Sequence, residues 1–157
     1  LTDSVALGNA KNFEEYQRFV GQIEGLAIAE RELLNLVKTQ DQEDEQSCFS
    51  DNTLADLKGN MRGIQRVYSG DEMGPGLMPL VKHSNPTLAV GIQGKIANCT
   101  QYLDLIPEPF DQSIVADANS EAHQSIDQAI TCLEDLSSMF SGAAVEMGLN
   151  VQSISGP

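Results

Sequence analysis

The chain has 157 residues, with 23 Asp and Glu against 9 Lys and Arg, and a formal net charge of -14 at pH 7. This length fits one ordinary domain with a buried core. The acidic excess argues against nucleic acid or an anionic membrane surface as a partner. No apolar run approaches the roughly 18 residues that a membrane-spanning helix needs.

A long amphipathic helix is predicted near the N-terminus, because apolar residues recur there at alternating spacings of three and four. Glu30 falls on this apolar seam, where an unpaired ionised carboxylate would cost several kcal/mol or have a raised pKa. Glu30 is therefore either part of a polar site or the structural partner of a cation on another helix, such as Arg62 or Arg66. The seam consists of Phe13, Tyr16, Val20, Ile23, Ala27, Leu34 and Val37.

The connection after this helix is acidic and then turns apolar, since residues 41–60 read DQEDEQSCFSDNTLADLKGN. Its carboxylates could hold a hard cation such as calcium. The run lacks the alternating ligands and glycines of a dedicated loop, which favours a solvated linker. Cys48 and Phe49 follow at the start of the next helix, so they belong either to a packed connection or to one wall of a site.

The second predicted helix has an N-terminal signal at Thr53 and Asp56, a close relative of the capping box. Ser50 or Asp51 could cap it instead. Gly70 is the predicted C-terminal stop. The apolar seam consists of Leu54, Leu57, Met61, Ile64 and Tyr68.

Two further helices are predicted after residues 71–86, a Gly- and Pro-rich loop with one short turn around residues 77–81. Ser84 or Asn85 would cap the third helix, with Pro86 in its first turn. The fourth helix begins at about residue 119 and ends at Gly148. Their seams are Leu88, Ile92, Ile96, Cys99, Leu103 and Ile106, and then Ala122, Ile126, Ala129, Leu133, Leu136, Phe140, Ala143 and Met147.

Four long amphipathic helices with short or moderate connections predict an all-α protein, an antiparallel up-and-down four-helix bundle. No segment alternates apolar and polar residues as a half-buried strand does. We expect residues 1–157 to form a single helical-bundle domain.

Cysteine and histidine spacings match no standard metal or redox motif. Cys48, Cys99 and Cys132 are too far apart for a CxxC pair. Two interpretations stay open: a helix–helix disulfide between Cys99 and Cys132, or three small apolar core residues. His83 and His123 begin neither HxxE nor HExxH, so the residues alone indicate no zinc or di-iron site.

Several segments together resemble the imelysin family. These are Glu30-Arg31, DQEDEQSCFSDNT at 41–53, GIQRVYSG at 63–70 and IPEPFDQSI at 106–114. The likeness extends over nearly the whole chain and corresponds to the C-terminal half of the family. Imelysins are bacterial periplasmic or surface-anchored proteins, often iron-regulated, and are described as metallopeptidases.

The resemblance implies one lobe of a two-lobed helical fold, whose GxHxxE signature lies in an N-terminal lobe. That lobe, in the same protein or a separate chain, is the implied partner. Family members usually read EHSCFS and NTH, where this chain has Gln46 and Leu54, so two potential histidine ligands are absent. The resemblance also implies a periplasmic or outer-membrane-anchored location, and iron or zinc only in the complete protein.

Two functions follow as expectations. The first is a binding component associated with iron uptake at the cell envelope, with no catalytic motif in this chain. The alternative is part of a metallopeptidase whose GxHxxE motif lies in the N-terminal lobe. We assign no catalytic or metal-binding residue here. Any binding site is expected to involve Glu30 and Arg31 with the turn residues Ser47, Cys48, Ser50 and Asp51, which would face the cleft between the lobes.

Overall fold

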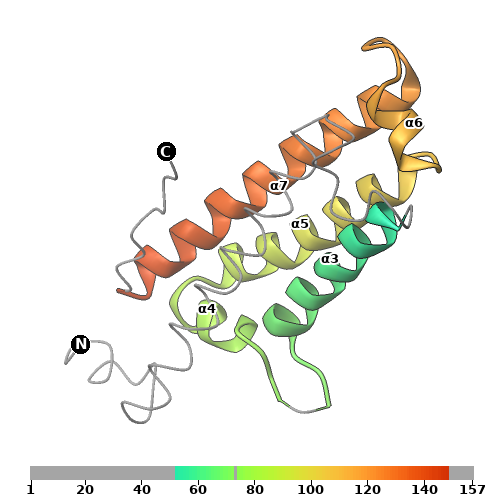
Figure 1. Cartoon of the computed structure of the whole chain (residues 1–157). Helices are drawn as coiled ribbons and strands as arrows, with labels where there is room; N and C mark the ends of the chain where they lie inside the picture. The colour runs from blue at the N-terminus through green and yellow to red at the C-terminus, as the bar shows by residue number, and fades with distance from the viewer. Residues whose placement is uncertain (1–51, 73, 149–157) are drawn as a thin grey trace, which may run out of the picture.

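A computed structural model describes residues 52–72 and 74–148, and this part of the chain is helical without a β-strand (Figure 1). The predicted all-α class is confirmed. The first predicted helix, with its seam from Phe13 to Val37, lies outside the described residues. The helices are α3 (Thr53–Ser69), α4 (Met78–Ser84), α5 (Pro86–Leu105), α6 (Phe110–Ile114) and α7 (Glu121–Glu146).

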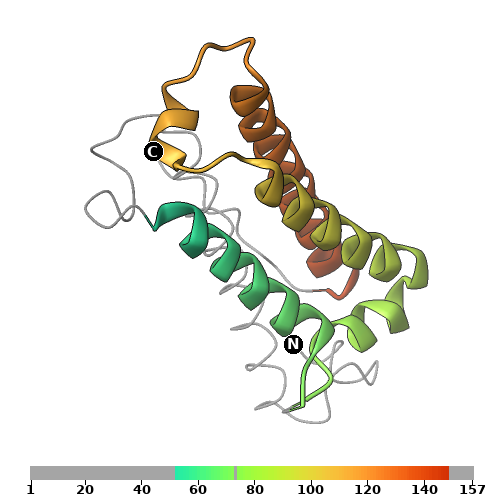
Figure 2. The same cartoon turned by 90° about the vertical axis from the view of Figure 1, so that its right-hand side faces the viewer.

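The three long helices lie side by side, with α5 packed against both α3 and α7 (Figures 1 and 2). Helix α5 runs antiparallel to its two neighbours, as the up-and-down prediction requires. The short helix α4 connects α3 to α5 at one end, and α6 lies between α5 and α7 at the other end (Figure 1).

The boundaries of α3 differ slightly from the prediction at one end and agree at the other. The N-cap is Asn52, whose side chain makes no capping hydrogen bond, and Thr53 is already the first helical residue. At the C-terminus, Gly70 has φ 85° and its N–H donates to the Arg66 carbonyl at 2.8 Å. The backbone conformation with positive φ favours glycine, which explains why the helix stops there.

The loop from α3 to α4 folds back on itself through two glycines. A side chain on Gly76, at φ 66°, would collide with the Tyr68 carbonyl oxygen and the Gly70 backbone nitrogen. The Leu77 N–H donates to the Tyr68 carbonyl at 2.9 Å. The loop therefore stays close to the end of α3, and the short turn predicted at 77–81 forms the start of α4.

Helix α5 begins with the cap that the sequence offered as one of two choices. Asn85 Oδ1 accepts the Leu88 N–H at 2.9 Å, and Pro86 occupies the first turn. The Asn85 amide also donates to Glu146 Oε1 at 3.0 Å, near the end of α7. One side chain thus starts α5 and joins it to the far end of α7.

The short helix α6 was not predicted, because residues 107–120 carry no repeating apolar spacing. Ser113 is buried and its hydroxyl donates to the Pro107 carbonyl at 2.8 Å, which ties α6 to the end of α5. Ser120 then caps α7 by accepting the His123 N–H at 3.1 Å.

The predicted seams that the structure describes, those of α3, α5 and α7, form a single core, with corrections at Leu88, Ala122 and Phe140. Leu88 is only partly buried, because the neighbouring Ala89 faces the interior instead. Phe140 also lies at the edge of the core, where its ring meets that of Tyr68 at a centroid distance of 5.6 Å. The largest fully buried side chains are Tyr68, Leu57, Met61, Ile64, Leu77, Ile92, Ile96, Leu103, Ile126, Leu133 and Leu136.

Cys99 of α5 and Cys132 of α7 form a disulfide, with Cα atoms 5.4 Å apart. This resolves the two interpretations of these cysteines, since they are cross-linked as well as buried in the core. Cys48 lies outside the described residues. The disulfide joins the middle of α5 and α7, which make the most extensive contact among the described helices.

Candidate functional site

The predicted binding residues Glu30, Arg31, Ser47, Cys48, Ser50 and Asp51 all lie outside the described residues, so their grouping stays a prediction. The structure does describe the start of α3, directly after this segment. Leu54, where the family resemblance expects a histidine, is 3% exposed and packs in the core. That position therefore supplies a core contact and has no group that could bind a metal.

The two histidines lie on different helices. His83 is exposed in the last turn of α4, and His123 is partly buried in the first turn of α7. Within the described ranges, no three side chains of His, Cys, Asp or Glu are grouped closely enough to hold a metal ion. In the same part of the chain, no helix combines the length and apolar character needed to cross a membrane.

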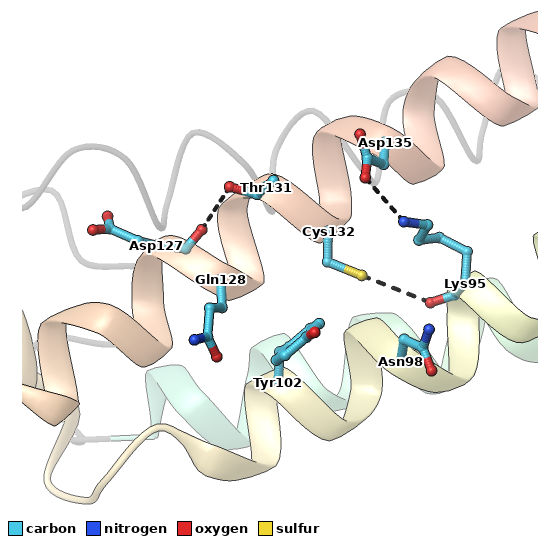
Figure 3. A pocket seen from close by; sticks show the side chains of 8 residues that line it. All are labelled: Lys95, Asn98, Tyr102, Asp127, Gln128, Thr131, Cys132 and Asp135. Carbon is cyan, nitrogen blue, oxygen red and sulfur yellow. Dashed lines mark hydrogen bonds and ion pairs between the residues drawn. The ribbon is translucent and has the colours of Figure 1, made fainter.

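A polar groove of about 290 Å³ runs between α5 and α7 (Figure 3). Both walls follow from helical spacing: side chains three and four residues apart on one helix point the same way. The cross-linked Cys132 forms part of the α7 wall (Figure 3). The lining residues are Lys95, Asn98 and Tyr102 of α5, and Asp127, Gln128, Thr131, Cys132 and Asp135 of α7.

An ion pair links the two walls of the groove (Figure 3). Lys95 Nζ donates to Asp135 Oδ2 at 2.9 Å, and both side chains keep partial contact with water. An exposed pair of this kind contributes at most about 1 kcal/mol. Asp127 adds a second carboxylate to the same wall, so the ionised groups of the groove are one cation and two anions, a net charge of -1.

The Cys132 sulfur of the disulfide lies beside the backbone of Lys95, the cation of this ion pair. Cys132 Sγ is 3.8 Å from the Lys95 carbonyl oxygen. Because this sulfur is bonded to Cys99, it carries no proton, and the contact is a packing contact rather than a hydrogen bond. The groove therefore combines exposed polar groups with one sulfur atom of the cross-link.

Chemically, the groove offers hydrogen-bonding amides, a phenol and two carboxylates to a small polar molecule. The hydroxyl of Thr131 donates its proton to the Asp127 backbone carbonyl at 3.0 Å. A backbone carbonyl is not a general base, so this hydroxyl is not activated as a nucleophile. Sequence reasoning missed this groove. In the sequence, the groove corresponds to polar residues that recur every three or four positions near each helical cysteine. These are Lys95, Asn98 and Tyr102 near Cys99, and Asp127, Thr131 and Asp135 near Cys132.

Comparisons with known proteins agree with the sequence resemblance. A family model described as Imelysin, whose short title places it among peptidases, matches residues 14–139. The chain is also 28% identical over 120 residues to Iron-regulated protein A of Synechococcus elongatus. This match covers 73% of the chain but 34% of the relative, so the chain spans about a third of that protein's length. No solved structure matches the chain.

Proposed function

The chain belongs to the imelysin family, and from this premise we propose that it is a binding component of an iron-related cell-envelope protein, without peptidase chemistry of its own. The observation that carries the iron association is the similarity to Iron-regulated protein A. Because this chain spans about a third of that relative, the rest of such a protein would supply the N-terminal lobe.

Binding is favoured over peptide hydrolysis by the environment of Leu54. This side chain is enclosed by the core, at a position where the resemblance expects a histidine ligand. A zinc peptidase needs three protein ligands and an open coordination position. The two histidines of the chain lie on α4 and α7, which begin at Met78 and Glu121, and neither helix carries the HxxE or HExxH spacing.

We place the binding site at Glu30, Arg31 and the turn from Ser47 to Asp51. Glu30 interrupts an apolar seam, which is hard to explain by stability alone. The turn supplies Ser47, Ser50 and Asp51 as hydrogen-bonding groups. Both groups offer charge and hydrogen bonds to a polar, iron-related ligand.

The disulfide supports a location outside the reducing cytosol. Cross-links such as that between Cys99 and Cys132 form and persist in oxidising compartments, including the bacterial periplasm. A periplasmic or outer-membrane-anchored protein fits this chemistry and the family membership together.

A second candidate function is a metallopeptidase that needs the rest of the protein. The observation in its favour is the peptidase title of the matching family. In this case the GxHxxE motif of the N-terminal lobe would bind iron or zinc and activate the water. This chain would then form the opposite wall of the cleft.

Iron binding by a Glu30→Leu variant tests the proposed site. We expect the purified parent chain to bind ferric citrate, a polar iron-related ligand. The variant should lose at least about tenfold in affinity, roughly 1.4 kcal/mol, because leucine offers neither a charge nor a hydrogen bond. Its unfolding midpoint should not fall, since the sequence places Glu30 on an apolar seam, and replacing a carboxylate there by an apolar group is often neutral or stabilising.

The matched control is Glu72→Leu, which removes the same charge from an exposed position in the loop after α3. It should bind ferric citrate as the parent does. Equal binding by the Glu30→Leu variant and the parent would show that the site is elsewhere.

A further inference from the structure

The two cysteines of the disulfide are both buried, but they differ in their position relative to the groove. Cys99 has an exposed fraction of 0% and lies in the core, whereas Cys132 is 4% exposed and forms part of the groove wall. Cys99 is not among the residues that line the groove. Of the two cysteines, Cys132 is therefore the one that borders the groove.

We propose that this groove is a thiol-exchange site at which an external thiol attacks Cys132. The thiolate of the incoming molecule forms a new bond to Cys132 Sγ while the bond to Cys99 Sγ breaks. Cys99 leaves as a thiolate and takes up the proton that the incoming thiol released. A second thiol then attacks the mixed disulfide, which yields the oxidised disulfide of the external thiol and a free Cys132 thiol.

The charges of the groove define the class of thiol that it admits. Lys95 is neutralised by Asp135 at 2.9 Å, so Asp127 leaves the lining of the groove with a net charge of -1. The whole chain carries a formal net charge of -14, so the groove lies in a negative overall field. A small thiol with a cationic amine is therefore attracted, and an anionic thiol such as glutathione is repelled.

The exchange does not require the bundle to unfold. Helices α5 and α7 also pack through apolar side chains of the core, among them Ile96 and Leu133. These contacts keep the helices together after the cross-link opens. Reduction through the groove is thus a reaction of the folded protein, and its rate should depend on the thiol that enters.

The attacked sulfur can be identified on the unmodified chain. The protein is treated with cysteamine under native conditions, quenched with acid during the reaction and digested for mass spectrometry. We expect the mixed disulfide on Cys132 in at least about tenfold excess over Cys99, with any Cys48 adduct resolved on its own peptide. Equal or greater labelling of Cys99 would overturn the proposal.

The charge preference is tested by comparing the rates of reduction by cysteamine and by glutathione at low ionic strength. The parent should react faster with cysteamine, after correction for the rates with a small model disulfide. Asp127→Asn should lower this preference by about three- to tenfold, since it brings the groove to neutrality. The control Glu121→Gln, an exposed change outside the groove in the first turn of α7, should leave the preference unchanged.

Two outcomes would contradict the role of the groove. One is equal preference in the parent and in Asp127→Asn. The other is a reduction rate that does not increase with thiol concentration, because such a rate would be set by unfolding of the chain and not by access through the groove.

Discussion

Replacing Cys99 and Cys132 together by alanine should lower the free energy of unfolding by about 3–4 kcal/mol. The two residues are separated by 33 positions, so the cross-link closes a long loop in the unfolded chain. Without it, the unfolded state gains the conformational entropy that the loop had excluded. Denaturant unfolding followed by circular dichroism measures the loss.

The single variants provide an internal control for this prediction. Cys99→Ala and Cys132→Ala each open the same loop, so either one alone should cause most of the loss seen in the double variant. Reductant should destabilise the parent and leave the double variant unchanged. A loss below about 0.5 kcal/mol, or an equal effect of reductant on parent and double variant, would show that the cross-link does not stabilise the fold.

Truncating Tyr68 to alanine should cost about 3–5 kcal/mol, the range for large aromatic core residues. Tyr68 is fully buried and connects all three long helices. It belongs to α3, its hydroxyl donates to the Ala89 carbonyl of α5 at 2.9 Å, and its ring meets Phe140 of α7 at 5.6 Å. The truncation therefore removes packing and one hydrogen bond at the same point.

Tyr68→Phe separates these two contributions and should cost only about 1 kcal/mol, because the ring contacts remain. It also has a pH signature. Burial raises the pKa of Tyr68 from 10.0 to about 12. The folded state thus favours the neutral phenol, and this stabilisation is complete below pH 10 and is lost as the pH rises toward 12.

The difference in stability between the parent and Tyr68→Phe should accordingly shrink over that alkaline interval. Denaturant titrations at a series of pH values would measure it. A difference that stays constant from neutral pH to pH 12 would mean that Tyr68 is not the buried donor described here.

The helices and their buried faces could be predicted from the sequence because one physical rule determines both. An amphipathic helix in a bundle must turn its apolar residues inward at a spacing of three and four. Leu57, Met61 and Ile64 follow that rule and are all buried. The rule has a tolerance of about one residue, which is why Ala89 could take the buried place predicted for Leu88.

Features that depend on the register between helices could not be predicted from the spacing of residues within one helix. Whether Cys99 meets Cys132 depends on how far α5 is shifted along α7, and spacing within one helix does not determine that shift. The groove depends on the same register, since its walls come from both helices. Helix α6 is short, so its residues 110–114 are too few to show a helical repeat.

The prediction of the site was based on different evidence from the prediction of the fold. Glu30 was selected because it breaks an apolar pattern, and the turn from Ser47 to Asp51 because of its resemblance to the imelysin family. The described residues add one fact that bears on this prediction, the burial of Leu54 at the start of α3. The arrangement of Glu30 and the turn remains a proposal for experiment.

A cleavage assay distinguishes the proposed binding role of this chain from peptide hydrolysis. Purified chain would be incubated with unfolded casein, with and without added zinc or ferrous iron, and with a chelator in a parallel sample. Mass spectrometry would detect the fragments. We expect casein to stay intact under all conditions. Metal-dependent, chelator-sensitive cleavage that co-purifies with the chain through gel filtration would contradict the account.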